Sequence, residues 1–404
     1  MTDSKTSPQP FLGYGRQTIH KDDLEAVTKA LSGDWLTQGP LVGEFETNLA
    51  KTCHAPHVIA CMNGTAALHL AYLGCGLKSG DSLLTSPLTF LATANAARFC
   101  GAEVQFADVD LETGCLCPEA VEASLGLDQE KKIKTIAAVH LAGNAADMKG
   151  LSEVAASREI QLVEDACHGL GGLHPDGNPI GSLGYSDSTV FSFHPVKPIT
   201  TAEGGAITVK DDETAERLRR LVSHGVSRDG FKISEEAVDG QGHENPWYYE
   251  MQELGFNYRL PDLNAALGIS QLKRLDTLQK RREALAHSYD EIIQERLSGK
   301  VRPLGRNAHG RHAWHIYVVR VDFEALGTTR AMVMQELRER GIGCQVHYIP
   351  LHLQPYYRAH GGWQRGSFPN AEALYDQMLT LPLFPNMADT DPERVVEALA
   401  DILS

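Results

Sequence analysis

One lysine of the chain lies in a sequence context that is unusual for a lysine. In FSFHPVKPITTAEGGAI, residues 191–207, Lys197 follows an apolar run and precedes small residues and a Gly-Gly pair. Lysines belong mostly on surfaces, whereas the flanking Pro195 and Pro198 restrict the backbone here. Burial or a neighbouring cation would lower the pKa of such an amine and free it to attack a carbonyl carbon. Lys197 is therefore a candidate nucleophile, with a surface lysine in a turn as the alternative.

An aspartate ends a predicted buried strand in IQLVEDACHGLGG, residues 160–172. Ligands of open α/β sheets bind at the carboxyl ends of strands, where Asp165 would lie. Its carboxylate would pair with the pyridine nitrogen of pyridoxal phosphate (PLP) and make the ring an electron sink. A helix cap or a buried ion pair is the alternative role. The GLGG run lacks the full GxGxxG spacing and opens no clear helix, which argues against dinucleotide binding.

A phosphate site is predicted in NGTAALHLA, residues 63–71, which follows a strand and begins a helix at Gly64-Thr65. The exposed amides of a helix N-terminus bind phosphate, helped by the helix dipole. A plain helix start capped by Asn63 would have the same sequence.

An aromatic residue, Phe90, follows another predicted strand in PLTFLATANAA. It would stack on a flat cofactor ring or belong to the core. The four features occur in the order Gly64-Thr65, Phe90, Asp165, Lys197, and the last two are 32 residues apart. One cofactor, PLP, accounts for all four.

Alternating strands and helices would position these residues. Apolar runs typical of buried strands occur in HVIACM, SLLTSP, AEVQFADVD, TIAAVHLAG and IQLVEDAC. Helical patterns occur in DDLEAVTKAL, NGTAALHLAYLGCGL, TFLATANAARF, SEVAASRE and DDETAERLRRLVSHG. The alternation predicts a parallel sheet covered by helices on both faces. STVFSF and GAITVK lie close together in the chain, which favours a hairpin or neighbouring strands.

The rest of the chain predicts a loop, a connector and a second domain. SGDWLTQGPLVG is expected to be a loop, and the polar stretch 227–249 a long functional loop. Residues 261–297 are predicted to be helical in one or two pieces, with Pro261 in the first turn. Beyond them we expect strands at WHIYVVRV and CQVHYIP and helices at TRAMVMQELRERG and PERVVEALADIL. The expected domains are 1–265, a PLP-binding large domain with an N-terminal segment, and 266–404, a linking helix with a small C-terminal domain.

Composition excludes several classes of protein. The chain has 404 residues, which suggests more than one domain, and a formal net charge of −15, which argues against nucleic acid as a partner. It has neither a run of 18 apolar residues nor a signal peptide, so no membrane association is expected. Eight cysteines without an export signal predict reduced thiols and a cytoplasmic location. Cys115 and Cys117 lack a second pair at zinc-binding spacing, and no metal site is predicted.

The blocks NGTAALHLA, VEDACHGLGG, FSFHPVKPITTAEGGA, GFNYRLPDLNAALG and LPLFPNM resemble those of the DegT/StrS family of sugar-nucleotide aminotransferases. The resemblance covers nearly the whole chain. It implies the fold-type I (aspartate-aminotransferase-like) PLP architecture: an α/β large domain with a mostly parallel seven-stranded sheet and a smaller α+β C-terminal domain. FSFHPVKPITT and QVHYIPLHLQPYYR look most similar to the branch that aminates UDP-linked sugars in the pseudaminic acid pathway.

The resemblance also implies roles for individual residues. Lys197 would hold PLP as a Schiff base and then transfer the proton, Asp165 would pair with the pyridine nitrogen, His168 would stand near the phenolic oxygen, and Phe90 would stack on the ring. Asn257 would reach the phosphate from the neighbouring subunit, so the site would need a homodimer. The phosphate would otherwise be held by Gly64, Thr65, Ala66 and Ser192.

The implied reaction is transamination. L-Glutamate would convert PLP to pyridoxamine phosphate, and a UDP-linked 4-keto-6-deoxy-N-acetylhexosamine would then receive the amino group at C4. Candidate substrate residues, for which an ordinary hydrogen-bonded role is the alternative, are Arg259, Arg311, His312, His315, His347, Tyr348 and His352. The block usually ending TGEGG has Ala202, and HLAGNAADM has Asn144 and Ala145 where HFAGQPCDM is usual, so another 4-keto or 3-keto sugar nucleotide remains an alternative.

Three other activities are disfavoured. Sugar 3-dehydrases of this type carry His at the lysine position, whereas Lys197 is present here. A non-catalytic regulator would not need the intact cofactor residues, and no mobile-loop cysteine suggests a desulfurase.

Overall fold

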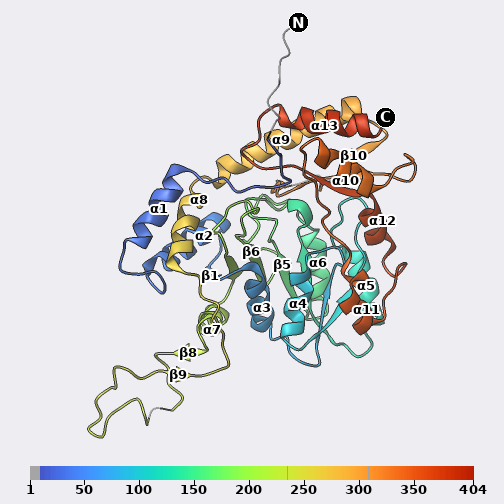
Figure 1. The fold of residues 1–404 in the computed structure, drawn as a ribbon. Helices are drawn as coiled ribbons and strands as arrows, with labels where there is room; N and C mark the ends of the chain where they lie inside the picture. The colour runs from blue at the N-terminus through green and yellow to red at the C-terminus, as the bar shows by residue number, and fades with distance from the viewer. Residues whose placement is uncertain (1–9, 234, 308–309) are drawn as a thin grey trace.

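A seven-stranded sheet lies at the centre of the molecule (Figure 1). The computed structural model describes residues 10–233, 235–307 and 310–404. The strands of the sheet, in chain order, are β1 (His57–Cys61), β2 (Ser82–Thr85), β3 (Glu103–Phe106), β4 (Ile133–Val139), β5 (Gln161–Asp165), β6 (Ser188–Ser192) and β7 (Gly205–Val209). They are arranged as β1-β7-β6-β5-β4-β2-β3, parallel from β6 to β3, with β7 antiparallel to both neighbours. The mostly parallel sheet and the neighbouring pair β6–β7 are confirmed.

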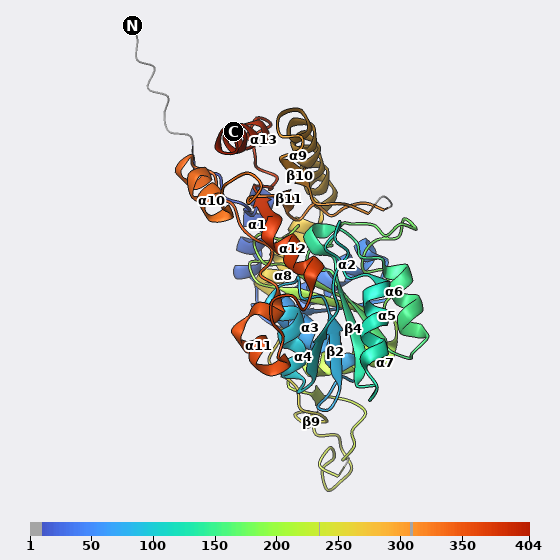
Figure 2. The same cartoon turned by 90° about the vertical axis from the view of Figure 1, so that its right-hand side faces the viewer.

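Helices cover both faces of this sheet, with α3 and α4 on one side and α5 and α6 on the other (Figure 2). The helices of the large unit are α1 (Lys21–Leu31), α2 (Pro40–Cys53), α3 (Gly64–Gly74), α4 (Leu91–Phe99), α5 (Pro118–Leu127), α6 (Met148–Ala156), α7 (Asp212–Val222) and α8 (Asp262–Leu272), with a short 3-10 helix η1 (Leu141–Gly143). Strand β1 is apolar after its first residue, His57, because helices cover both of its faces. Ile59 packs on the side of α3, whereas Val58 packs with Phe45 of α2 and Ile269 of α8.

A second, smaller sheet lies in the C-terminal part of the chain. Its antiparallel strands are β10 (Val301–Pro303), β11 (Tyr317–Val321) and β12 (Met378–Leu381). The helices here are α9 (Leu275–Arg296), α10 (Arg330–Glu339), α11 (Pro355–Gly361), α12 (Pro369–Gln377) and α13 (Asp391–Ile402), with the 3-10 helix η2 (Leu351–Leu353). Leu12 belongs to this apolar core, whereas Leu275 and Leu278 pack with Phe45 of the large unit. The division at residue 265 stays a prediction.

The connector is helical in two pieces, α8 and α9, and Pro261 precedes the first helical turn as its N-cap. The expected strand at CQVHYIP is wrong. Residues 344–350 form a loop with a single bridge, from Gln345 to Thr380. Its His347 side chain contacts Thr380 at 2.9 Å, and Tyr348 lines a cavity described below. The loop expected at SGDWLTQGPLVG ends earlier than predicted, because α2 already begins at Pro40.

The expected functional loop forms an arm that projects from the body in both views (Figures 1 and 2). Two short paired strands close its base, β8 (Val226–Ser227) and β9 (Glu250–Met251). None of the described helices combines the length and apolarity needed to cross a membrane.

The contact between α8 and α2 gives a stability test. A Cβ on Gly268 would lie 2.6 Å from the Phe45 ring and 2.9 Å from Thr201 Cγ2, whereas a Cβ on Gly43 of α2 would meet nothing within 4 Å. Overpacking costs about 1–3 kcal/mol, and replacing a helical glycine by alanine gains about 0.5–1 kcal/mol. We expect Gly268→Ala to lower the melting temperature and Gly43→Ala to leave it unchanged or raise it. Equal effects of the two substitutions would contradict this packing.

Candidate active site

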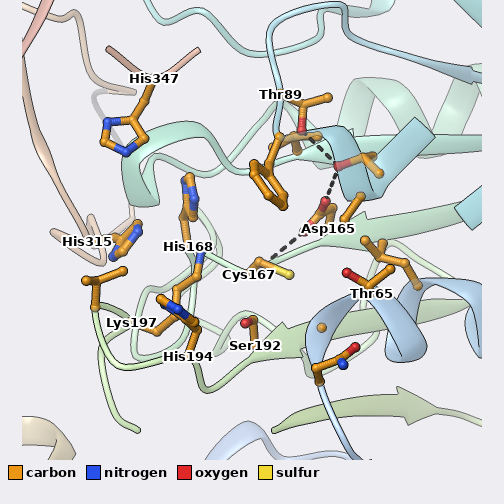
Figure 3. A pocket seen from close by; sticks show the side chains of 18 of the residues that line it. Thr65, Thr89, Asp165, Cys167, His168, Ser192, His194, Lys197, His315 and His347 are labelled. Carbon is orange, nitrogen blue, oxygen red and sulfur yellow. Dashed lines mark hydrogen bonds between the residues drawn. The ribbon is translucent and has the colours of Figure 1, made fainter. Parts of the chain in front are cut away.

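A cavity of about 390 Å³ opens at the carboxyl ends of the parallel strands. Val139, Asp165 and Ser192, the last residues of β4, β5 and β6, all line it. Segments that follow β1 and β2 contribute one wall, and residues near β11 and β12 close the opposite side (Figure 3). Of the residues predicted from sequence, the structure places these around the cavity: Gly64, Thr65, Phe90, Asp165, His168, Ser192, Lys197, His315, His347 and Tyr348.

Lys197 reaches the cavity from a turn that follows β6. Its backbone N–H donates to the His194 carbonyl at 2.9 Å, which fixes the turn. Burial lowers the pKa of the Lys197 amine, and the nearby Cys167 and Asp165 oppose part of that shift. A lower pKa leaves more of the amine unprotonated near neutrality, as a nucleophile requires.

Asp165 is held by donors on two sides of its carboxylate. The Thr93 hydroxyl donates to Oδ2 at 2.6 Å, and the Cys167 backbone N–H donates to Oδ1 at 3.2 Å. The Thr89 hydroxyl lies 2.8 Å from the Thr93 hydroxyl. Thr89 is the donor in this contact, because the Thr93 proton is already donated to Asp165. The carboxylate is 4% exposed, and hydrogen bonds to a charged acceptor offset the cost of such burial. The residue type and place fit a partner for a protonated pyridine nitrogen.

The N-terminus of α3 forms a cradle against Ser192. A Cβ on Gly64 would lie 2.8 Å from Ser192 Cβ and 3.1 Å from its hydroxyl, so only glycine lets the helix start approach Ser192 this closely. A Cβ on Gly205 would lie 2.4 Å from the Asn63 carbonyl, which shows how closely β7 approaches the helix start. The amide of Ala66 already donates to Asn63 Oδ1 at 2.9 Å as the helix cap. The helix N-terminus and the neighbouring Ser192 hydroxyl, which line the cavity together, suit a phosphate group.

Three of the histidines that line the cavity, His168, His315 and His347, are buried. The rings of His168 and His315 are 4.3 Å apart, and Tyr348 Oη lies 3.0 Å from His168 Nε2. Burial, reinforced by the positive charge of Lys197, holds the pKa of His168 well below its usual range and lowers that of His347 to about 4. These imidazoles are therefore neutral near pH 7 and offer hydrogen bonds without adding positive charge.

Other predicted residues lie outside the cavity lining. Asn257 is exposed, and Arg259 donates to the Ser223 hydroxyl at 3.0 Å. The buried His352 bonds Glu372 at 2.8 Å, so a structural partner accounts for it.

Arg311 and His312 are likewise engaged within the chain. Arg311 donates to the Gly171 carbonyl, while His312 Nδ1 accepts the Trp314 backbone N–H at 2.9 Å. Burial lowers the pKa of His312 to about 3. Across the described part of the chain, no cluster of three or more His, Cys, Asp or Glu is arranged to hold a metal ion.

The sequence-based reasoning missed several cavity residues. They are Tyr14, Asn63 as a lining residue, Thr89, Thr93, Cys167, His194 and Glu203. Thr93 lies in the first turn of α4, whereas Thr89 precedes the N-cap residue Phe90, so helix periodicity does not link the two positions. Tyr14 also lacked a local signal, because it reaches the cavity from an N-terminal segment that packs on the C-terminal core.

Residues 17–400 match the model of the DegT/DnrJ/EryC1/StrS aminotransferase family. The chain belongs to this family. The Bacillus subtilis spore coat polysaccharide biosynthesis protein SpsC is 39% identical over 394 residues, covering 97% of each protein. Among solved structures, Helicobacter pylori PseC, an aminotransferase involved in pseudoaminic acid biosynthesis, matches with a TM-score of 0.87 and 27% identity over 97% of this chain and 99% of PseC. Spr1654 from Streptococcus pneumoniae in its PLP form matches with a TM-score of 0.85 and 26% identity, over 98% of this chain and all of that one.

PLP is the cofactor of this family of aminotransferases, and Spr1654 has been solved in both its PLP and pyridoxamine phosphate forms. The cavity fits such a group at each of its parts. Lys197 offers an amine of lowered pKa, Asp165 a buried carboxylate, the start of α3 with Ser192 an anion cradle, and Phe90 an aromatic face. When bound, PLP carries the amino group and withdraws electrons from the reacting carbon.

The Thr93 hydroxyl can be tested by removal. Thr93→Val keeps the shape but removes the donor to Asp165, and a hydrogen bond to a charged group contributes about 1.5–3 kcal/mol. We expect weaker PLP retention and a transamination rate lower by roughly tenfold or more, measured by cofactor absorbance and single-turnover kinetics. Thr89→Val, which removes only the indirect donor, should have a smaller effect. Wild-type behaviour of Thr93→Val would contradict the assigned contact.

Proposed function

We propose that this aminotransferase moves the amino group of L-glutamate to C4 of a UDP-linked 4-keto-6-deoxy-N-acetylhexosamine. The product would be a 4-amino sugar nucleotide for pseudaminic acid-type biosynthesis. The observation that carries the chemistry is the convergence of the Lys197 amine and the Asp165 carboxylate on one cavity beside the start of α3. The choice of sugar is supported by the likeness to PseC and by the FSFHPVKPITT and QVHYIPLHLQPYYR segments.

Within this reaction we assign the proton transfers to one atom. Lys197 Nζ would hold the cofactor, and its amine would take and return the proton at the reacting carbon as general base and acid. The Asp165 carboxylate would stabilise the positive charge of a protonated pyridine nitrogen. His168, His315 and His347, neutral in this setting, offer hydrogen bonds to the sugar and to the cofactor's oxygen.

We also propose a cytoplasmic homodimer with shared sites. The arm and its base expose large apolar side chains, with Trp247 70% and Leu254 76% exposed. Clustered exposed apolar residues mark interaction surfaces. Asn257, exposed in this chain, would then reach the phosphate in the partner's cavity.

Substrate choice is tested with purified enzyme, glutamate and a panel of keto sugars. We expect a UDP-linked 4-keto-6-deoxy-N-acetylhexosamine to give a 4-amino product by mass spectrometry, with a lower kcat/KM for dTDP-linked sugars. Lys197→Ala, the matched control, should give no product. Reaction with dTDP sugars alone would refute the sugar assignment and leave the aminotransferase activity intact. Another 4-keto or 3-keto sugar for a surface polysaccharide would then be favoured, in line with the likeness to SpsC.

The shared site is tested by mixing two impaired variants, Lys197→Ala and Asn257→Ala. A mixed dimer would contain one site with Lys197 from one chain and an intact Asn257 from the other. After subunit exchange, we expect activity to rise toward about a quarter of the wild-type value, as random pairing of two subunits predicts. Activity no greater than the average of the separate variants would refute the assignment of Asn257 to the partner's site.

A further inference from the structure

Arg282 is a buried cation close to the reactive cavity. It lies on α9 and is 2% exposed. Among the salt bridges of the described residues, none involves Arg282, whereas its neighbour Arg281 pairs with Asp389. A buried charge without an opposite charge is costly, so its retention calls for a specific role.

The guanidinium of Arg282 binds backbone carbonyls instead. Its NH1 group donates to Trp314 at 3.4 Å, His315 at 3.2 Å and Leu383 at 3.1 Å. The first two carbonyls precede β11 and the third follows β12, so one side chain joins both segments to α9. The His315 peptide is also held from its other side, because its N–H donates to the Ala142 carbonyl at 3.1 Å.

His315 connects Arg282 to the reactive cavity, because its carbonyl binds Arg282 and its ring lines the cavity. Its ring packs against His168, and both rings line the cavity with Lys197. Arg282 and Lys197 also line a second, very small cavity of about 10 Å³ behind the turn that carries Lys197. That space holds about one water molecule, so the guanidinium is near the reactive lysine with little solvent to screen it.

We propose that Arg282 is a positioning residue for transamination, which acts through the His315 backbone to hold the His315 imidazole beside His168 and Lys197.

The charges around His315 are consistent with this role. Burial lowers the pKa of Arg282 to about 10, which leaves it protonated at neutral pH. Burial first, and then repulsion from charge on His168, Lys197, Arg282 and His347, holds the pKa of His315 well below its usual range. Of these four groups, the two imidazoles carry charge only when they are protonated. Removal of the Arg282 charge therefore favours protonation of His315, and its pKa rises. The activity that needs neutral His315 would then be lost at a higher pH than in the wild type.

The test compares Arg282→Gln, Arg282→Lys and the control Arg281→Gln as PLP-loaded enzymes. Arg281 also ties α9 to the segment after β12, through the Pro385 and Met387 carbonyls, but does not contact His315. We expect Arg282→Gln to lower kcat on the order of tenfold to a hundredfold, the range for a small misplacement at a reacting centre. Its acidic loss of kcat should move toward neutral pH. Arg282→Lys, whose ammonium carries the charge and three donors, should restore most of kcat and the wild-type pH profile. Arg281→Gln should change the melting temperature alone.

A double substitution tests whether Arg282 acts through His315. If Arg282 acts through His315, Arg282→Gln should cause little further loss in a His315→Gln background. An unchanged kcat and pH profile in folded Arg282→Gln would overturn the proposal, as would full additivity of the two losses. If Arg282→Gln does not fold, the His315→Gln variant tests the proposal by itself. A wild-type kcat in His315→Gln would refute a positioning role of Arg282 that acts through His315.

The inference rests on the aminotransferase reaction and on a catalytic use of His315, not on a particular sugar. Any keto sugar that the wild type accepts serves for the comparison. Failure of the wild type with every UDP sugar would refute the proposed substrate and leave the comparison of variants intact.

Discussion

A buried carboxylate at the end of β5 is the constraint on which the site depends. The Asp165 carboxylate lies where water scarcely reaches it, and the hydroxyl of Thr93 and the backbone N–H of Cys167 supply hydrogen bonds that water would otherwise make. The parallel sheet brings this carboxylate to the same edge as Ser192 and the start of α3. The turn after β6 places Lys197 at the same edge, so that all of these groups line one cavity.

Near the Asp165 carboxylate, the buried histidines of the cavity are uncharged at neutral pH. Three histidines that border the cavity, His168, His315 and His347, have lowered pKa values because they are buried near Lys197 and near one another. A neutral imidazole can donate at one nitrogen and accept at the other, so the wall of the cavity can adapt to a sugar's hydroxyl and keto oxygens. The same burial lowers the pKa of the Lys197 amine. Desolvation thus sets both the reactivity of the lysine and the polarity of its surroundings.

Much of the fold and of the lining of the cavity could be predicted because the signals are local. A strand that ends in Asp165, a helix that begins at Gly64 and a lysine between prolines are each visible within a dozen residues. Long-range contacts carry no such signal: Thr93 meets Asp165 across 72 positions, and Arg282 binds the His315 carbonyl across 33. The alternating pattern of CQVHYIP failed as a strand predictor because the segment is a wall of the cavity, with His347 and Tyr348 as lining residues.

The central claim is that Lys197 is the lysine that holds the cofactor. Borohydride reduction of the PLP-loaded enzyme, followed by proteolysis and mass spectrometry, tests it directly, since reduction fixes the linkage between cofactor and lysine. We expect a phosphopyridoxyl group on the peptide that contains Lys197, and its loss when the enzyme is treated with an amino donor before reduction. A label on another lysine, or no label on a protein that retains PLP, would show that Lys197 does not hold the cofactor.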